Sequence, residues 1–258
     1  MNGRRARRVD TCDSSEPAAG TDVQRRLAAI EEAPLFRGAS EEEKWELATH
    51  ARDCRAARKE FFLQEGQPAL ETLLLCSGRV KLTQLSAEGN EFIVRLVGPG
   101  EQVGSLGLPP GGLHTSTAEA LEDSRALLWE RRHLDGLIEK SAALHRNALR
   151  ILAQRLRNSE QHSRELATER VPQRLSRTLS RLVGQVGRPA EGAVLVSLTR
   201  EELAQMTGTT LFTVSRIFSY WETMGVIRPR REGVLIDDSA GLVRIGESAP
   251  DARRERAR

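Results

Sequence analysis

The spacing of apolar residues along the chain changes at two places, and each change predicts a different kind of structure. From about residue 53 to residue 130, short apolar stretches of strand length alternate with turns that contain glycine. This pattern is typical of a β-sandwich or barrel. From residue 131 to residue 167, leucines and small residues recur at heptad-like spacing, which predicts a long amphipathic helix. The chain is therefore expected to contain a strand-rich domain followed by a helical region.

Two shorter helices are predicted before the strands. Ser40 and Glu43 form a capping-box pattern, so a helix is expected over residues 41–51, with Trp45 and Leu47 facing inward. Another short helix is expected to begin between residues 22 and 30. The stretch before it is rich in arginine, proline and small residues and has no period, which predicts a disordered arm.

Residues 198–227 predict two short helices joined by a tight turn. Thr199 and Glu202 form a capping box at the first helix, and Gly208 suits the left-handed conformation that the turn requires. The second helix carries a buried apolar stripe at helical spacing, made of Val214, Ile217, Phe218 and Trp221. Such a pair is typical of a helix-turn-helix, whose second helix enters the DNA major groove. An ordinary helical hairpin within a core is the alternative.

A short basic hairpin is predicted directly after these helices. Arg228, Arg230 and Arg231 precede a turn at residues 232–233, and an apolar strand follows at residues 234–236. A basic hairpin beside a helix-turn-helix is a wing, and arginines on a wing suit contacts to DNA phosphates.

Two sets of motifs resemble one known family. The stretch LTREELAQMTGTTLFTVSRIFSYWETMGVI is similar to the winged-helix signature of the Crp/FNR family of bacterial transcription regulators, and the upstream VPQRLSRTLSRLV resembles the lead-in helix of that family. The stretches FLQEGQPA, LLCSGRVKL and GPGEQVG resemble its cyclic-nucleotide-binding jelly roll. The resemblance covers about residues 30–246.

The periodicity and the resemblance together predict an α+β protein with a β jelly-roll barrel, a long dimerisation helix and a C-terminal winged helix-turn-helix. We divide the chain into a disordered basic arm (1–25), an effector barrel (26–130), a dimerisation helix (131–168), a DNA-binding domain (169–246) and a basic tail (247–258). Within the DNA-binding domain, residues 184–193 are expected to form a Gly/Pro loop.

The long helix carries two apolar stripes. The first, which we take as the dimer-helix set, consists of Leu134, Leu137, Leu144, Ala148 and Ile151. The second consists of Leu149, Leu152 and Leu156. One stripe can pack on the barrel and the other on a second copy of the chain. The resemblance implies a parallel dimer seam along this helix. A helix packed only on its own chain is the alternative.

Arg216 is the main candidate for reading DNA, because an arginine on the outer face of the second helix can contact guanine or a phosphate. Family members usually carry polar base readers in the first turn of this helix. Leu211 and Phe212 stand there instead, so a different half-site is expected. They could touch thymine methyl groups, or Phe212 could belong to the core. The complete set of DNA-contact candidates is Thr199, Thr209, Thr210, Thr213, Ser215, Arg216, Arg228, Arg230 and Arg231.

The resemblance also locates an effector pocket, whose candidate residues are Gly104, Ser105, Leu106, His114 and Thr115. In cyclic-nucleotide-binding members, a glutamate binds the ribose hydroxyl and an arginine binds the cyclic phosphate. Ser105 and His114 replace these two residues, so cyclic AMP is not expected to be the effector.

Several alternatives for the effector stay open. They are another small molecule, haem with His114, His133 or Cys76 as a candidate ligand, a thiol switch at Cys54 or Cys76, and an empty pocket. An iron–sulfur cluster is not expected, since Cys12 stands alone near the N-terminus.

Composition narrows the class of protein. The 258 residues carry a net charge of only +3, so the basic charge is local. No apolar run approaches the roughly 20 residues of a membrane span, and no signal peptide is evident, so a cytoplasmic location is expected. Three widely spaced cysteines argue against a disulfide framework. No catalytic or metal-binding motif is found, so an enzyme is not expected.

We therefore expect a homodimeric transcription regulator that binds a pseudo-palindromic site in double-stranded DNA and is gated by an effector other than cyclic AMP. RNA polymerase and a small-molecule effector are further candidate partners. The alternative is a constitutive or architectural DNA-binding protein with a vestigial effector barrel.

Overall fold

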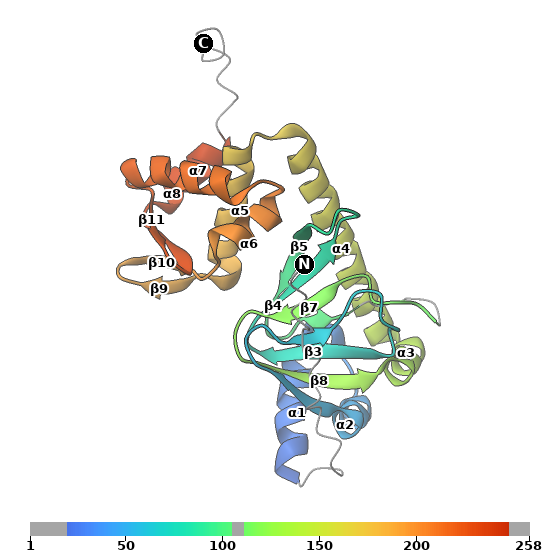
Figure 1. The fold of residues 1–258 in the computed structure, drawn as a ribbon. Coiled ribbons are helices and arrows are strands. Elements are labelled where there is room, and N and C mark those ends of the chain that lie inside the picture. The colour runs from blue at the N-terminus through green and yellow to red at the C-terminus, as the bar shows by residue number, and fades with distance from the viewer. Residues whose placement is uncertain (1–19, 105–110, 248–258) are drawn as a thin grey trace. The chain divides into compact units, whose positions relative to one another are not determined.

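The computed structural model describes residues 20–104 and 111–247 (Figure 1). The chain divides into two compact units, residues 1–157 and 158–258, and each is described by itself. The fold is α+β, with a strand-rich first unit and a mainly helical second one, as predicted. No helix among the described residues is long and apolar enough to cross a membrane.

The first unit begins with helices that pack outside the barrel. They are α1 (Gly20–Glu32), the 3₁₀ turn η1 (Pro34–Phe36) and α2 (Glu41–His50). Helix α1 thus starts inside the stretch expected to be a disordered arm. The capping box of Ser40 and Glu43 is present at the start of α2, as predicted.

The orientation predicted for Trp45 is wrong. Its side chain is 57% exposed, whereas Leu47 is fully buried. Two residues along an α-helix turn the side chain by about 200°, so these two positions cannot both face inward. Leu47 and its neighbour Ala48 face the core, and Trp45 lies on the outer side of α2.

Two four-stranded antiparallel sheets form the barrel. One has the strand order β1-β8-β3-β6 and the other β2-β7-β4-β5. Their strands are β1 (Arg52–Ala56), β2 (Phe61–Leu63), β3 (Glu71–Ser77), β4 (Val80–Leu85), β5 (Glu91–Val97), β6 (Gln102–Val103), β7 (Thr117–Ala120) and β8 (Ser124–Glu130).

Strand β8 explains why part of the sequence is continuously apolar. Ala126 and Leu128 point into the barrel core, whereas Leu127 and Trp129 pack against the helices outside it. Successive side chains of a strand point to opposite faces, so a strand covered on both faces needs apolar residues at every position.

The predicted long helix is interrupted. It consists of α3 (Arg131–Lys140) and α4 (Ala142–Thr168), and Ser141 between them has an extended backbone with φ −96° and ψ 110°. The Ser141 hydroxyl accepts a hydrogen bond of 3.4 Å from the Leu144 amide, which helps α4 to begin. A serine that bonds its own neighbouring backbone favours such a boundary.

The two apolar stripes have different surroundings. Leu134, Leu137, Leu144 and Ala148 are buried in the core of the first unit, and Ile151 packs against it. Leu149, Leu152 and Leu156 are 55%, 36% and 60% exposed. The residues assigned to the dimer helix therefore pack on their own barrel, and the second stripe is the exposed one.

The second unit is built on α5 (Val171–Val186). It contains the hairpin β9 (Arg188–Ala190) and β10 (Ala193–Val196), where a loop was expected. The remaining elements are α6 (Arg200–Thr207), α7 (Leu211–Thr223), β11 (Ile227–Arg230), β12 (Gly233–Ile236) and α8 (Ser239–Glu247). Its sheet has the order β11-β12-β10-β9.

An ion pair joins α5 to the end of α4 within this unit. The Arg181 guanidinium lies 2.6 Å from Glu165 Oε1, and Gln161 donates a hydrogen bond of 3.0 Å to the same oxygen. The Glu165 side chain is only 2% exposed. Burial raises the pKa of this carboxyl, but the hydrogen bonds from Arg181 and Gln161 lower it further, so the net pKa lies below its ordinary value.

Candidate DNA interface and effector pocket

The turn between α6 and α7 has the predicted construction. Thr199 accepts a hydrogen bond of 3.2 Å from the Glu202 amide, and Glu202 accepts one of 2.8 Å from the Thr199 amide. Gly208 ends α6 with φ 59° and ψ 46°, a left-handed conformation that favours glycine. A Cβ atom there would lie 3.0 Å from Leu166 Cδ2, so the site also has little room for a side chain.

Hydroxyl groups begin helix α7. Thr210 accepts a hydrogen bond of 3.2 Å from the Thr213 amide, and the two hydroxyl oxygens lie 3.0 Å apart. Among the candidate DNA contacts, Thr210 therefore caps the helix, and Thr213 is the residue whose amide it binds. Thr209 and Ser215 are half-buried beside them.

The outer face of α7 combines apolar and basic side chains. The predicted inner stripe from Val214 to Trp221 is buried, as expected. Leu211 is 44% exposed and Phe212 is 83% exposed. The alternative that Phe212 belongs to the core is therefore wrong. Arg216 is exposed one turn further along, and within the described residues no ion pair holds its guanidinium.

The wing forms where it was predicted, between β11 and β12, but two of its arginines are already paired. Arg228 binds Asp237 Oδ2 at 2.9 Å and Glu191 Oε2 at 3.0 Å. Arg230 binds the same Glu191 oxygen at 2.6 Å. The hydrogen bonds from Arg228 also lower the pKa of Asp237. Sequence reasoning missed both carboxylates: Glu191 lies 37 residues from Arg228 along the chain, and Asp237 lies nine residues from it.

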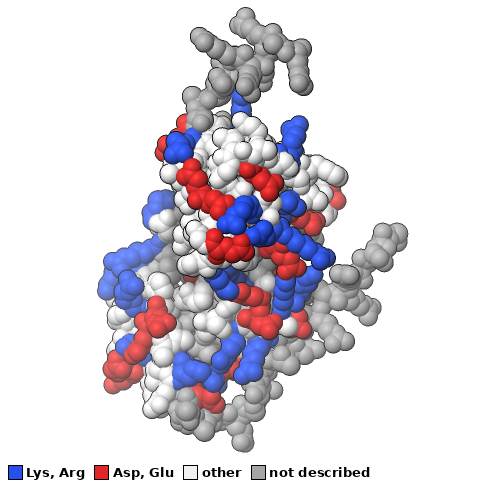
Figure 2. All heavy atoms as spheres, turned by 90° about the vertical axis from the view of Figure 1, so that its left-hand side faces the viewer, with Lys and Arg blue, Asp and Glu red and all other residues white. Residues whose placement is uncertain are grey.

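On the face drawn in Figure 2, acidic and basic side chains are interspersed and do not form separate acidic and basic patches. The ion pairs of the wing are one local example of this arrangement. Positive charge available for phosphate contact is therefore smaller than the number of arginines in the sequence suggests.

The effector-pocket residues are only partly described. Ser105 and Leu106 lie outside the described residues. Gly104 follows β6 with φ 99°. His114 is buried, and its amide donates a hydrogen bond of 2.8 Å to the Gln67 carbonyl. Thr115 is exposed, and its carbonyl accepts a hydrogen bond of 2.6 Å from Gln84.

Two arginines that sequence reasoning missed converge beside Gly104. Arg155 of α4 donates to Gln102 Oε1 at 2.8 Å and to the Gln102 carbonyl at 2.9 Å. Arg95 of β5 donates to that same carbonyl at 3.1 Å. The Gln102 side chain is fixed from its other end by a 2.6 Å hydrogen bond to the Thr72 hydroxyl.

These arginines share an unfavourable electrostatic environment. Burial lowers the pKa of Arg155 to about 10, and the charge of Arg95 lowers it as well. Burial also lowers the pKa of Arg95, opposed by Glu101, whose carboxylate lies 3.7 Å away. Two guanidinium groups held close together by carbonyl oxygens are suited to binding an anion.

The candidate haem and thiol residues lie in different places. His133 of α3 stacks on His50 of α2 with ring centroids 4.1 Å apart. The Cys76 thiol is half-buried, and burial raises its pKa to about 11. Cys54 is buried and disulfide-bonded. Among the described residues, no group of three or more His, Cys, Asp or Glu side chains is arranged to hold a metal ion.

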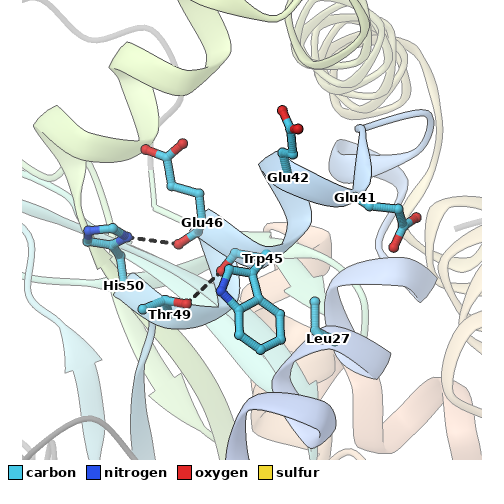
Figure 3. A pocket seen from close by; sticks show the side chains of 7 residues that line it. All are labelled: Leu27, Glu41, Glu42, Trp45, Glu46, Thr49 and His50. Atoms are coloured by element: carbon cyan, nitrogen blue, oxygen red, sulfur yellow. Dashed lines mark hydrogen bonds between the residues drawn. The ribbon is translucent and has the colours of Figure 1, made fainter.

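A further hollow lies on the outer side of α2. Trp45 faces Leu27 of α1 across it, and Glu42 and Glu46 stand at its rim (Figure 3). Its volume is about 600 Å³. The hollow contains none of the residues assigned to DNA or effector binding.

Comparisons with known proteins find relatives of both units of the chain. The chain matches the models of a Crp-like helix-turn-helix domain over residues 173–245 and of a cyclic nucleotide-binding domain over residues 54–141. It is 32% identical to a CRP-like cAMP-activated global transcriptional regulator from Mycobacterium tuberculosis, over 70% of this chain and 81% of that protein. It is 31% identical to the cyclic AMP receptor protein of Thermus thermophilus, over 83% of this chain and 96% of the relative.

A solved structure of a CRP-family transcriptional regulator from Thermus thermophilus is similar as well. Its TM-score is 0.66 at 26% identity, and the match covers 76% of this chain and 97% of that one.

Proposed function

The chain belongs to the Crp/FNR family of transcription regulators, and from this premise we propose that it acts as a homodimer whose binding to a pseudo-palindromic DNA site is controlled by an anionic effector other than cyclic AMP. The observation that carries the proposal is the position of Arg155. It stands beside Leu156 on α4, so neighbouring turns of one helix carry both the proposed anion-binding group and the exposed stripe.

The proposed dimer seam is the exposed stripe of Leu149, Leu152 and Leu156. These residues are three and four positions apart, which is the spacing of core positions in a coiled coil. The seam thus moves from the stripe first assigned to it, because that stripe packs on the barrel. Three exposed leucines on one helix face are costly in water unless another surface covers them.

The proposed DNA reader is the outer face of α7. Arg216 is exposed there and can reach a guanine edge or a phosphate. The capped start of α7 presents backbone amides, which attract phosphates through the positive end of the helix dipole. Two such helices in a symmetric dimer would read half-sites about one DNA turn, or roughly 34–36 Å, apart. Contact with RNA polymerase stays a prediction.

The proposed effector differs from that of the relatives whose names mention cyclic AMP. The residues expected for the ribose hydroxyl and the cyclic phosphate are replaced by Ser105 and His114. The cationic groups near Gly104 are instead Arg95 and Arg155. An anion placed between them would relieve the repulsion and the burial cost that lower their pKa values.

Gating is proposed to pass through α4. An anion bound at Arg155 would compete with the hydrogen bonds from this side chain to Gln102. Helix α4 would then shift against the barrel. The seam beside it would change, and with it the spacing of the two α7 helices. The effector pocket and the DNA-binding helices would thus be coupled through α4, which would have one position with the effector and another without it.

A thermal-shift screen of the full chain tests the effector proposal. The panel contains cyclic AMP, cyclic GMP, cyclic dinucleotides, 2-oxoglutarate and haem. A ligand at about 100 times its dissociation constant stabilises the protein by about 2.7 kcal/mol. We expect a shift with an anion other than cyclic AMP, together with a change in DNA affinity measured by fluorescence anisotropy. A shift with cyclic AMP alone would contradict the proposal, and DNA binding that no compound alters would favour a constitutive binder.

A further inference from the structure

Phe212 is the most exposed large apolar side chain among the described residues. It is 83% exposed at the second position of α7, with Leu211 before it at 44%. The fold does not need this side chain, because the inner stripe of α7 already fills the core, with Val214 at 0% and Trp221 at 2% exposure. Phe212 and Leu211 are adjacent, and contiguous exposed apolar surface is typical of a site that a partner covers.

The position of Phe212 identifies which partner can cover it. Arg216 is four residues further along the same helix, so both side chains lie on one face. The residues at the start of a recognition helix are those that reach base edges in the major groove. The first turn of α7 contains no acidic residue, so it offers no carboxylate to accept a hydrogen bond from the amino group of cytosine.

The chemistry of Phe212 selects one feature of that groove. A phenyl ring can neither donate nor accept a hydrogen bond, so it distinguishes base pairs only by apolar contact. In the major groove, the 5-methyl group of thymine is the apolar feature that differs between base pairs. We propose that the first turn of α7 is a thymine-methyl subsite, in which Phe212 packs on a thymine 5-methyl group while Arg216 contacts the same half-site. This inference rests on the proposed DNA binding.

The experiment replaces that methyl group without changing any hydrogen bond. A bound sequence is first selected with the full chain from a random DNA pool. Each thymine of the selected half-site is then replaced by deoxyuracil, which lacks only the 5-methyl group. At one position in each half-site, we expect the substitution to weaken binding about fourfold, the effect of one buried methyl group.

Variants assign the effect to Phe212. Phe212→Ala should bind the thymine duplex more weakly and should no longer distinguish thymine from uracil. Tyr220→Ala is the matched control, since Tyr220 is an aromatic residue on the same helix and is 62% exposed. It should retain the full discrimination. Affinity for an unrelated duplex and its salt dependence should be the same for Phe212→Ala and the wild type, because phosphate contacts are unchanged.

Two results would overturn the inference alone. One is equal binding of thymine and uracil duplexes by the wild type at every position. The other is a Phe212→Ala variant that keeps the discrimination. Failure of the chain to enrich any sequence from the pool would instead overturn the proposed function, and this inference with it.

Discussion

The guanidinium of Arg155 on helix α4 lies 2.8 Å from Oε1 of Gln102 on strand β6. The two residues are 53 positions apart in the sequence, and their contact attaches the exposed leucine stripe to the barrel. Burial disfavours the charged form of Arg155 and lowers its pKa to about 10. Arg155 is half-buried, and no carboxylate among the described residues forms an ion pair with it. A cation in such surroundings is suited to binding an anion.

Arg155→Gln is expected to abolish the thermal shift caused by the effector. The ligand-free melting temperature should change little, because the lost hydrogen bonds to Gln102 and the relief of burying a charge have opposite signs. Arg150→Gln is the control, since Arg150 is exposed on the same helix and, within the described part of the chain, its guanidinium hydrogen-bonds Asn147 rather than the barrel. An unchanged effector shift in Arg155→Gln would remove this residue from the pocket.

Leu152→Glu combined with Leu156→Glu is expected to convert the protein to a monomer at micromolar concentration. Each substitution would place a carboxylate against its symmetry mate in an apolar seam, where unpaired charge is costly. Light scattering after gel filtration measures the mass. Leu85→Glu changes a leucine of similar exposure, 61%, at the end of β4 and should leave the mass unaltered. Leu144→Glu is not a seam test, because Leu144 is in the core.

Arg216→Ala is expected to weaken binding to the selected site by about 1–3 kcal/mol while leaving binding to unrelated DNA nearly unchanged. Arg231→Ala should behave differently. Arg231 lies exposed at the turn of the wing, so its loss should weaken binding to all sequences alike and reduce the salt slope by about one. Anisotropy titrations at several salt concentrations separate the two. Equal losses on both kinds of DNA for Arg216→Ala would show that this residue contacts phosphate.

Glu165→Gln is expected to remove part of the acid sensitivity of the second unit. The folded-state pKa of Glu165 is lowered below its ordinary value of 4.5, so this carboxylate contributes stability above that pH. The contribution disappears as pH falls from 4.5 through the lower folded-state pKa. Melting curves from about pH 7 to about pH 3 should therefore fall less steeply for the variant, which should be less stable near pH 7. Parallel curves for both proteins would contradict this assignment.

The Cys76 thiol is expected to react slowly. With a pKa of about 11, its thiolate fraction at pH 8 is roughly 200-fold smaller than that of an ordinary cysteine with a pKa near 8.5. Alkylation followed by mass spectrometry of the peptide containing Cys76 measures the rate against an unfolded control. Labelling at the unfolded rate would restore the thiol-switch alternative at this residue.

Local patterns in the sequence were sufficient for the ends of several helices. The capping boxes at Ser40 and Thr199 and the turn at Gly208 involve hydrogen bonds or dihedral angles within a few residues. The break at Ser141 was missed because the heptad-like spacing continues across it. The hairpin β9–β10 was missed because its strands of three and four residues lie among glycines and a proline.

The binding sites were less accessible to sequence reasoning because they depend on contacts between distant residues. Arg155 follows Ile151 by one turn on the face of α4 that meets the barrel, so a lone charge on an apolar stripe was the available signal. The ion pair of Glu191 with Arg228 could not be predicted from the sequence around the wing, because the two residues are 37 positions apart. Exposure of Phe212 likewise depends on which residues fill the core of the second unit.

The ion pairs of the wing affect how such a protein searches a genome. Arg228, Arg230 and Arg231 bring three positive charges and Glu191, Glu232 and Asp237 bring three negative ones, so these six side chains together carry no net charge. Non-specific attraction to DNA increases with the number of unopposed cations, because each phosphate contact releases counterions. A phosphate that binds Arg228 or Arg230 must first displace a carboxylate. We therefore expect visits to the many non-target sequences to be brief, and occupancy of the target to depend mainly on the base contacts proposed for α7.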